Sequence, residues 1–265
     1  MTTERSAWSG MVQVDDTALA VTDTGGPGIP VVYLNGSYAD QKHWNHVIVE
    51  LGDGYRHISY DERARGGSQR SADYSFEACI RDLDAVLAAR GVERAILVGW
   101  SYGAMVAVHW ADRNPARTIG VVAVDGAYPY NWIDDAARAQ IRKLFRRLSW
   151  LFPLARPLGL AARMSAEQHA EVNIEINELL GDLGPILDRV TVPVRYVEAS
   201  GEALGSGEDG HAQARATLDP YLERNPNLTI AATVPSNHSK ILRKDFRAIA
   251  DTVRGLAVPS SHAAG

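Results

Sequence analysis

The chain has 265 residues, of which 46% are hydrophobic and 22% are charged, and its formal net charge is −5. These values are close to those of average soluble globular proteins, so they exclude a mostly disordered chain. The negative charge argues against broad binding of nucleic acid, which requires a basic face. No stretch approaches the ~18 consecutive apolar residues of a membrane-spanning helix, so we expect no stable membrane insertion.

The chain contains one cysteine, Cys79, and therefore no intramolecular disulfide bond. This cysteine content is typical of a reducing compartment. The first ten residues, MTTERSAWSG, lack the apolar core of a signal peptide. The sequence therefore predicts a cytoplasmic location. Cys79 falls on the apolar face of a predicted helix, where we expect a buried and inert thiol.

Short apolar runs alternate with helical patterns along the chain, which is typical of an α/β fold with a mainly parallel sheet and crossover helices. The first half predicts a strand pair joined by a turn at Asp15-Asp16, and an amphipathic helix that ends before Gly91. The predicted strands here are 11–14, 18–23, 31–35 and 56–60, and the predicted helices are 39–51 and 75–89.

The second half continues the same alternation after a long interruption. Its predicted strands are 95–99, 119–126, 192–197 and 228–234, and its predicted helices are 102–113 and 242–254. Together with the first half, these strands predict an eight-stranded, mainly parallel sheet flanked by helices. We expect one discontinuous core domain, formed by residues 1–126 and 191–258, and a flexible tail at 259–265.

Residues 127–190, which we call the insertion, contain helical patterns and several prolines but no convincing strand. About sixty residues between two core strands are too many for a simple connection, so we expect a small helical lid. A basic run at Arg142, Lys143, Arg146 and Arg147 accompanies apolar residues at helical spacing. We interpret it as a solvated helix face, with a membrane-surface helix as the alternative.

The segment Gly99-Trp100-Ser101-Tyr102-Gly103 matches the pattern G-x-S-x-G and lies between a predicted strand and a predicted helix. A serine on such a sharp turn exposes its hydroxyl, and the first N–H groups of the helix point toward developing negative charge. Small flanking residues are required because larger side chains would collide with the neighbouring strand and helix. This context favours a nucleophile over an ordinary turn that happens to contain serine.

A serine hydroxyl is a weak nucleophile until a base takes its proton. Among eight histidines, His238 lies in the loop between the last predicted strand and the last predicted helix. Residues at the carboxyl end of a parallel strand face the ligand in this type of sheet. His43, His46 and His109 lie within predicted helices, where packing or surface roles are expected. We therefore predict that His238 is the general base.

These motifs, with two further loops, resemble the α/β-hydrolase fold family over nearly the whole chain. Asn35-Gly36-Ser37 is similar to the His-Gly-x oxyanion loop of the family, and residues 61–68 (DERARGGS) are similar to its D-x-R-G-x-G-x-S loop. Trp44 is similar to a common aromatic residue of the family, and the order of Ser101 before His238 matches its triad. The resemblance is to the branch with a serine nucleophile, which includes small-molecule esterases and lactone hydrolases.

This resemblance implies that the backbone N–H groups of Ser37 and Tyr102 are the oxyanion donors. Two departures from the family pattern surround that site. Asn35 replaces the usual histidine, and Ala64-Arg65 replaces the usual Gly-His pair. We expect both changes to alter the support of the oxyanion loop without removing it.

A triad also needs a carboxylate that orients the histidine. The resemblance implies two positions: Asp125 at the end of the 119–126 strand, and Glu202 in the loop after the 192–197 strand. Glu208 and Asp209 lie further along the same loop. We favour Asp125 because a rigid strand precedes it, as an orienting residue requires, and Glu202 remains the alternative.

The sequence thus predicts a serine hydrolase of a small carbonyl substrate, most simply an ester or a lactone. Amide hydrolysis, C–C bond hydrolysis and acyl transfer use the same triad and remain open, as does a non-catalytic binding protein on this fold. The serine at position 101 of the G-x-S-x-G turn, the nucleophile elbow, weighs against epoxide hydrolases and dehalogenases, which resemble this chain but carry aspartate there.

The predicted partner is an apolar or ring-containing small molecule. Trp132 and Trp150 are candidates for lining its pocket, with burial inside the insertion as the alternative for each. No metal site is expected, since His43 and His46 have no third ligand. No cofactor is expected either, because the glycines at 25, 26 and 28 do not begin a helix after a strand. A homodimer remains possible.

Overall fold

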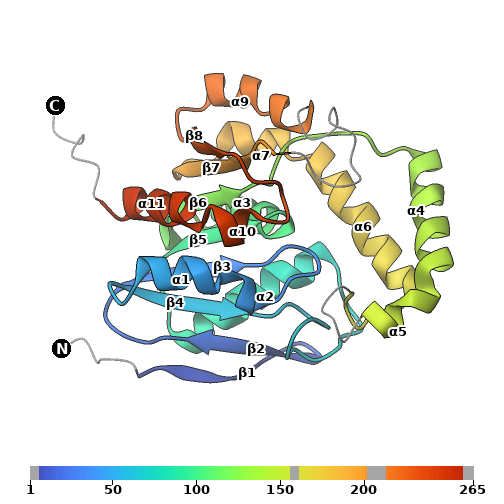
Figure 1. The fold of residues 1–265 in the computed structure, drawn as a ribbon, viewed down its shortest axis with the longest axis horizontal. Helices are drawn as coiled ribbons and strands as arrows, with labels where there is room; N and C mark the ends of the chain where they lie inside the picture. Colours follow the sequence, from blue (N-terminus) through green and yellow to red (C-terminus); the bar gives the residue numbers. More distant parts are fainter. Residues whose placement is uncertain (1–5, 156–160, 202–212, 259–265) are drawn as a thin grey trace.

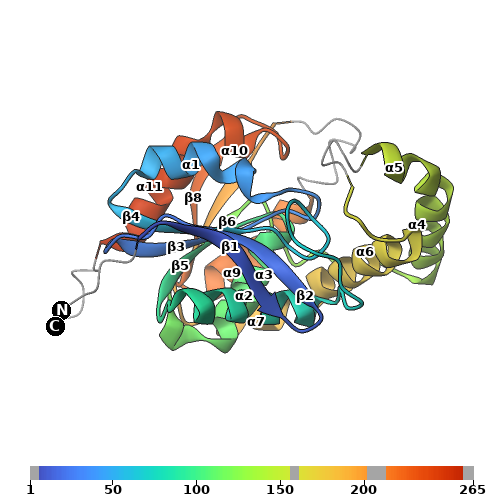
Figure 2. The same ribbon diagram turned by 90° about the horizontal axis from the view of Figure 1, so that it is seen from below.

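The computed structural model describes residues 6–155, 161–201 and 213–258. Its centre is one sheet, shown edge-on between two helical layers in Figure 2. In the described part of the chain, eight strands follow the order β1-β2-β4-β3-β5-β6-β7-β8. They are β1 (Trp8–Val14), β2 (Thr17–Asp23), β3 (Ile29–Leu34), β4 (Tyr55–Tyr60), β5 (Ala95–Trp100), β6 (Thr118–Val124), β7 (Val194–Ala199) and β8 (Leu228–Val234).

The sheet is antiparallel only at one edge, where β1 pairs with β2 and β2 pairs with β4. The remaining neighbours are parallel. Because β3 lies between β4 and β5, the strand order reverses beside β3, and the carboxyl ends of β3 and β5 lie next to each other. Ligands bind at such a reversal in open α/β sheets. The predicted eight-stranded, mainly parallel sheet is confirmed.

Helices cover both faces of the sheet, and a separate pair extends beyond its carboxyl edge (Figure 1). One layer contains α1, α10 and α11, and the other contains α2, α3, α7 and α9 (Figure 2). The helices are η1 (Gln41–Trp44), α1 (Asn45–Leu51), α2 (Phe76–Arg90), α3 (Tyr102–Arg113), η2 (Pro115–Arg117), α4 (Asp135–Leu148), η3 (Ser149–Leu151), α5 (Phe152–Ala155), α6 (Ala166–Gly181), α7 (Gly184–Arg189), α9 (Asp219–Arg224), α10 (Ile241–Lys244) and α11 (Phe246–Ala257).

The central strand β5 shows why the core has two halves. Leu97 packs on the side of α2 and α3, whereas Ile96 and Val98 pack on the side of α1 and α11, because successive side chains of a strand point to opposite faces. All three side chains are fully buried. Burying each of them contributes on the order of 2 kcal/mol, so the strand that precedes Ser101 is held firmly from both sides.

Several boundaries differ from the sequence-based prediction, and three of the differences have a clear local cause. The 39–51 helix begins as the 3₁₀ turn η1, where the Asp40 carboxylate accepts the Lys42 N–H and caps the start. The 242–254 helix is two helices, because Asp245 between α10 and α11 departs from helical geometry. The 119–126 strand ends at Val124, because Asp125 takes a positive φ of 43° and turns the chain out of the sheet.

The insertion contains α4, α5, α6 and α7 and no strand among its described residues. Helices α4 and α6 pack together through Ile141, Ala170 and Ile174. They are also joined by ion pairs of Arg142 with Glu171 and of Arg138 with Glu178. By contrast, α7 packs into the main core beside α3, so α4 and α6 are the part that projects beyond the sheet (Figure 1).

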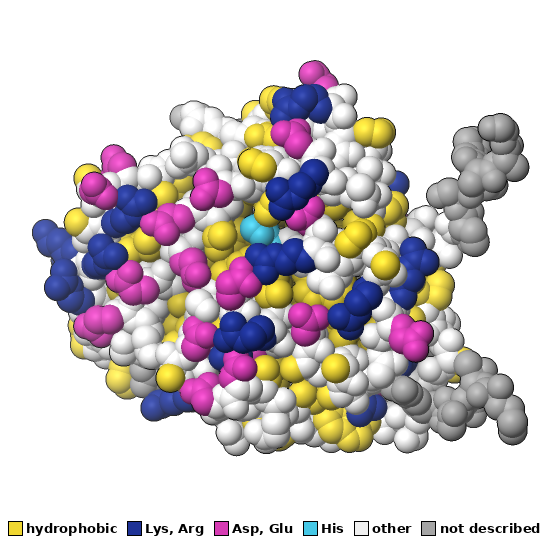
Figure 3. Space-filling view, turned by 180° about the vertical axis from the view of Figure 1, so that it is seen from behind, with side chains coloured by type: hydrophobic (Ala, Val, Ile, Leu, Met, Phe, Trp, Pro, Cys, Tyr) yellow, Lys and Arg dark blue, Asp and Glu magenta, His cyan; other side chains and the backbone are white. Residues whose placement is uncertain are grey.

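The face that carries α2, α3 and α7 has acidic and basic side chains interspersed (Figure 3). Ion pairs link these helices, with Arg113 on α3 joined to Glu77 on α2 and Arg189 on α7 joined to Asp112 on α3. Such exposed pairs stabilise a fold only modestly. None of the helices in the described ranges is long and apolar enough to cross a membrane.

Candidate active site

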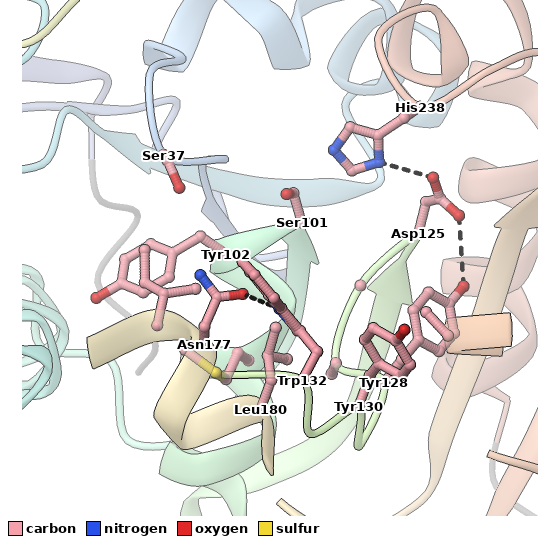
Figure 4. Close-up of a pocket in the computed structure, with 15 residues that line it drawn as sticks. Ser37, Ser101, Tyr102, Asp125, Tyr128, Tyr130, Trp132, Asn177, Leu180 and His238 are labelled. Carbon is pink, nitrogen blue, oxygen red and sulfur yellow. Dashed lines mark hydrogen bonds and ion pairs between the residues drawn. The ribbon is translucent and has the colours of Figure 1, made fainter. Parts of the chain in front are cut away.

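A cavity of about 200 Å³ lies between the carboxyl ends of β5 and β6 and helix α6 of the insertion (Figure 4). Most of its polar side chains come from the loops that follow the strands, Asn177 comes from α6, and most of its apolar side chains come from α3, α6 and the chain after β6. The described residues that line it are Ser37, Ser101, Tyr102, Met105, Asp125, Gly126, Ala127, Tyr128, Tyr130, Trp132, Ile176, Asn177, Leu180, Ala214 and His238.

Ser101 occupies the sharp turn between β5 and α3, with φ 56° and ψ −116°. Its N–H donates to the Val124 carbonyl at 3.0 Å, which ties the turn to the end of β6. A Cβ at Gly99 would lie 2.2 Å from the Gly103 carbonyl oxygen, and a Cβ at Gly103 would lie 2.2 Å from the Leu34 carbonyl oxygen. Only glycine allows these backbone approaches, so the two glycines make the turn that presents the Ser101 hydroxyl.

His238 and Asp125 meet across the end of the sheet. His238 Nδ1 lies 2.7 Å from Asp125 Oδ2. The other ring nitrogen of His238 faces the side of the cavity where Ser101 and Ser37 lie (Figure 4). The ring also packs against Trp100, with 5.4 Å between the ring centroids. The histidine is therefore held between a carboxylate and an indole, and only 28% of its side chain is exposed.

Asp125 is fixed by its own contacts. Its side chain is 4% exposed, and Oδ1 accepts hydrogen bonds from the Ala199 N–H at 3.1 Å and from the Tyr128 hydroxyl at 3.4 Å. Its N–H donates to the Val197 carbonyl of β7 at 2.8 Å. Both carboxylate oxygens are thus used, one toward His238 and one toward the protein. The alternative acids Glu202, Glu208 and Asp209 lie outside the described residues.

The two predicted oxyanion donors belong to adjacent backbone segments. Ser37 follows β3 and Tyr102 begins α3, and both line the cavity beside Ser101. The close approach of Gly103 to Leu34 brings these segments together. The Tyr102 side chain is buried and its hydroxyl donates to Cys79 Sγ at 3.2 Å. Burial raises the pKa of the Cys79 thiol to about 12, so Cys79 is a buried hydrogen-bond acceptor here.

The two candidate tryptophans have different surroundings. Trp132 lines the cavity, and its Nε1–H donates to Asn177 Oδ1 on α6 at 2.7 Å. Trp150 is 68% exposed and does not line this cavity, which corrects the expectation for that residue. The chain from β6 enters α4 at Asp134, whereas Trp150 lies in η3 at the opposite end of that helix. Trp150 is therefore remote from the cavity.

Sequence reasoning missed several lining residues. Tyr128 and Tyr130 follow Asp125 closely, so their position after a strand end was a usable signal. Burial, with a further contribution from the Asp125 carboxylate, raises the pKa of Tyr128, which keeps its hydroxyl protonated as a donor. Ile176, Asn177 and Leu180 share one face of α6. Their pattern alone does not tell which cavity they meet. Across the described ranges, no group of three His, Cys, Asp or Glu residues is arranged to hold a metal ion.

Comparisons with known proteins identify the family and the fold. The model of the alpha/beta hydrolase family matches residues 31–262. A haloalkane dehalogenase of Mesorhizobium japonicum is 29% identical over 139 residues, which is 52% of this chain and 45% of the relative. Epoxide hydrolase A of Mycobacterium tuberculosis is 36% identical over 119 residues, which is 43% of this chain and 37% of the relative. The matches thus span less than half of the length of these relatives.

Solved structures resemble the fold over nearly its full length. An esterase from Thermogutta terrifontis has a TM-score of 0.73 at 20% identity and covers 96% of this chain and 100% of its own. An enol-lactonase from Burkholderia xenovorans has a TM-score of 0.70 at 19% identity and covers 94% of this chain and 99% of its own. At these identities the likeness establishes the fold.

Proposed function

Because this chain belongs to the alpha/beta hydrolase family, we propose that it is a serine hydrolase that cleaves a small, largely apolar ester or lactone through an acyl-enzyme. The observation that carries the proposal is the convergence of Ser101 and the His238–Asp125 pair in one small cavity. These residues come from three loops at the carboxyl edge of the sheet. A nucleophile, a base and an orienting acid are the parts that acyl transfer requires.

The proposed reaction begins with attack of Ser101 Oγ on the substrate carbonyl carbon, while His238 takes the hydroxyl proton. The N–H groups of Ser37 and Tyr102 stabilise the negative oxygen of the tetrahedral intermediate. When the intermediate collapses, the C–O bond to the leaving group breaks and His238 returns the proton to the departing oxygen. A water molecule, deprotonated by His238, then attacks the acyl-enzyme and releases the acid and Ser101.

Asp125 has a specific part in this cycle. Its hydrogen bond to Nδ1 fixes the tautomer in which the other ring nitrogen accepts the Ser101 proton, and its charge stabilises the imidazolium that forms. The strand end and two protein hydrogen bonds prevent the carboxylate from rotating. We therefore assign the acid to Asp125 rather than to Glu202.

The nucleophile separates this proposal from two named relatives. The dehalogenase and epoxide hydrolases match roughly half of this chain, and the resemblance described above associates those activities with an aspartate at the elbow. Serine occupies that position here. A serine alkoxide that faces backbone donors is suited to a carbonyl carbon, which supports an ester or lactone as substrate.

The cavity supports a small, neutral acyl group. Its volume of about 200 Å³ is below the range of ~300–1,000 Å³ for pockets that hold drug-sized ligands. Among its described lining residues there is no lysine or arginine, and the ionisable side chains are Asp125, His238 and tyrosines. These described residues therefore offer no cation to a substrate carboxylate, whereas Met105, Ile176 and Leu180 among them offer apolar contacts.

A panel of p-nitrophenyl esters with acyl chains of two to twelve carbons, together with aryl-fused lactones, tests this proposal. We expect the wild type to hydrolyse short neutral esters or lactones and to discriminate against long acyl chains. The Ser101→Ala variant should lose at least 10³-fold in kcat. Trp132 belongs to the insertion and lines the cavity. Trp132→Ala should therefore change how KM depends on the length of the acyl chain. A wild type that hydrolyses none of these substrates would contradict the proposal.

A further inference from the structure

The β3–η1 loop that contains Ser37 rests on a buried carboxylate that the proposed mechanism does not use. Glu62 directly follows Asp61 in the loop after β4 and is only 5% exposed. Glu62 Oε1 accepts the backbone N–H of Asn35 at 3.0 Å, and Oε2 accepts the side-chain Nδ2–H of Asn35 at 2.9 Å. One carboxylate thus holds both the main chain and the side chain of a single residue.

Asn35 is in turn saturated with hydrogen bonds. Its Nδ2 also donates to the Tyr60 carbonyl at 2.7 Å, and its Oδ1 accepts the Trp44 indole N–H at 2.8 Å. This network fixes the side chain from three directions. Asn35 lies two residues before Ser37, whose N–H is a proposed oxyanion donor, so the orientation of the Asn35 peptide governs where that donor points.

A second anchor comes from the same loop after β4. Arg65 Nε donates to the Ser37 carbonyl, and Arg65 Nη1 donates to the Arg63 carbonyl at 2.9 Å. The Arg65 N–H donates to the Glu62 carbonyl at 3.0 Å, which closes a turn between the two side chains. Glu62 and Arg65 therefore hold the segment 35–37 at its two ends. Asn35 and Arg65 are two of the positions at which the sequence departs from the usual family pattern, and Glu62 lies in the same loop as Arg65.

We propose that Glu62 is a positioning residue for the oxyanion donor at Ser37, and that it performs this role only as a carboxylate. The inference rests on the proposed function. Two N–H groups point at the two oxygens of Glu62, and an ionised carboxylate accepts with both. A protonated acid or an amide presents a donor to one of them, which breaks one hydrogen bond and releases one end of the loop.

The surroundings of Glu62 place its proton uptake near neutral pH. Burial raises the pKa of the Glu62 carboxyl to about 7, although the Arg65 guanidinium and the Asn35 hydrogen bonds act to lower it. The other ionisable groups that face it are Tyr60 at the end of β4 and Cys79 on α2. Burial raises the pKa of both groups, so both remain neutral and leave Arg65 as the charged neighbour.

The test compares Glu62→Gln with the matched control Glu175→Gln. Glu175 is a partly buried carboxylate on α6 that accepts the Phe76 N–H at 2.9 Å, does not line the cavity, and has a pKa raised by burial. The measurements are kcat and KM for the best ester across pH 5 to 9. We expect Glu62→Gln to lower kcat on the order of 10- to 100-fold with little change in KM, as misplacement of a donor does.

The pH profile separates positioning from mere structural support. Because protonated Glu62 should resemble Glu62→Gln and keep part of the activity, log(kcat/KM) rises with a slope above one over roughly one to two pH units below the pKa of Glu62 in the wild type and in Glu175→Gln. In Glu62→Gln the slope falls to one. Asn35→Ala keeps the Glu62 charge but removes one donor, so it should lower kcat and move the acidic limb to higher pH. This second variant decides the question if Glu62→Gln does not fold.

A Glu62→Gln variant with wild-type kcat and an unchanged acidic limb would overturn the inference while leaving the proposed function intact. An Asn35→Ala variant with wild-type kcat would do the same. A wild type with no esterase activity and no reaction at Ser101 would overturn the proposed function, and the role of Glu62 with it.

Discussion

At the scale of single residues, the proposed chemistry depends on contacts between positions that are far apart in the chain. His238 and Asp125 are 113 residues apart and lie 2.7 Å from each other. The sequence could suggest each of them, because each follows a strand of a parallel sheet. It favoured Asp125 over Glu202 only because a rigid strand precedes Asp125, since the loops after β6 and β7 both leave the carboxyl edge of the sheet.

Asp125→Asn tests the assignment of the acid. Asparagine preserves the shape but favours the wrong tautomer of His238, so kcat should fall by about 10³- to 10⁴-fold. Glu202→Gln is the control and should retain wild-type kcat. Hydrolysis of a p-nitrophenyl ester at pH 8 measures both variants. Loss of activity in Glu202→Gln, with activity retained in Asp125→Asn, would reverse the assignment.

The raised pKa of Glu62 also predicts how the free energy of unfolding changes with pH. Its pKa is raised from 4.5 to about 7 in the folded chain, so the folded state binds this proton more tightly than the unfolded state. The stabilisation is therefore fully present below pH ~4.5 and is lost as pH rises through about 7. Urea denaturation should show the wild type losing on the order of 2–3 kcal/mol more than Glu62→Gln between pH 5 and pH 8. Equal losses of stability in the wild type and in Glu62→Gln would contradict the raised pKa of Glu62.

At the scale of elements, the strand–turn–helix from β5 to α3 carries the strongest sequence signal, and its reason is steric. The pattern G-x-S-x-G is needed because Gly99, Gly103 and Leu34 bring three backbone segments into contact. The insertion carries a weaker signal. Its amphipathic pattern predicted helices, but α4 and α6 bury their apolar faces partly against each other. Periodicity alone could not tell that Trp132 meets the cavity and Trp150 meets solvent.

Gly103→Ala tests the steric account of the turn. The new Cβ would lie 2.2 Å from the Leu34 carbonyl oxygen, and backbone cannot yield there without moving α3 or the oxyanion loop. We expect a loss of about 1–3 kcal/mol in the free energy of unfolding and a fall in kcat. Gly255→Ala is the matched control, because a Cβ there meets nothing within 4 Å inside α11.

The control should raise stability by about 0.5–1 kcal/mol, since alanine favours a helix more than glycine does. Its kcat should stay at the wild-type value. Thermal unfolding and ester hydrolysis, measured on both variants, give the two readouts. Equal stability of Gly103→Ala and the wild type would contradict the close approach between α3 and β3.

At the scale of the whole molecule, the order and type of the elements could be read from alternating apolar runs, because the central strands of the parallel sheet, such as β5 and β6, are buried on both faces. The features that the sequence did not predict are local ones. Asp125 leaves the sheet with a positive φ that propensity does not foresee. In the sequence, Asn35 departs from the oxyanion-loop pattern of the family, and Glu62 belongs to the separate loop 61–68. Only the folded chain joins the two residues, through two hydrogen bonds.

The central claim is that Ser101 is an activated nucleophile at the carboxyl edge of this sheet. Intact-protein mass spectrometry after treatment with a serine-directed fluorophosphonate tests it without knowledge of the substrate. The account predicts one phosphonyl adduct, mapped to Ser101 by peptide analysis, and no adduct in Ser101→Ala. A wild type without an adduct, or labelling that persists at the same rate in Ser101→Ala, would contradict the account.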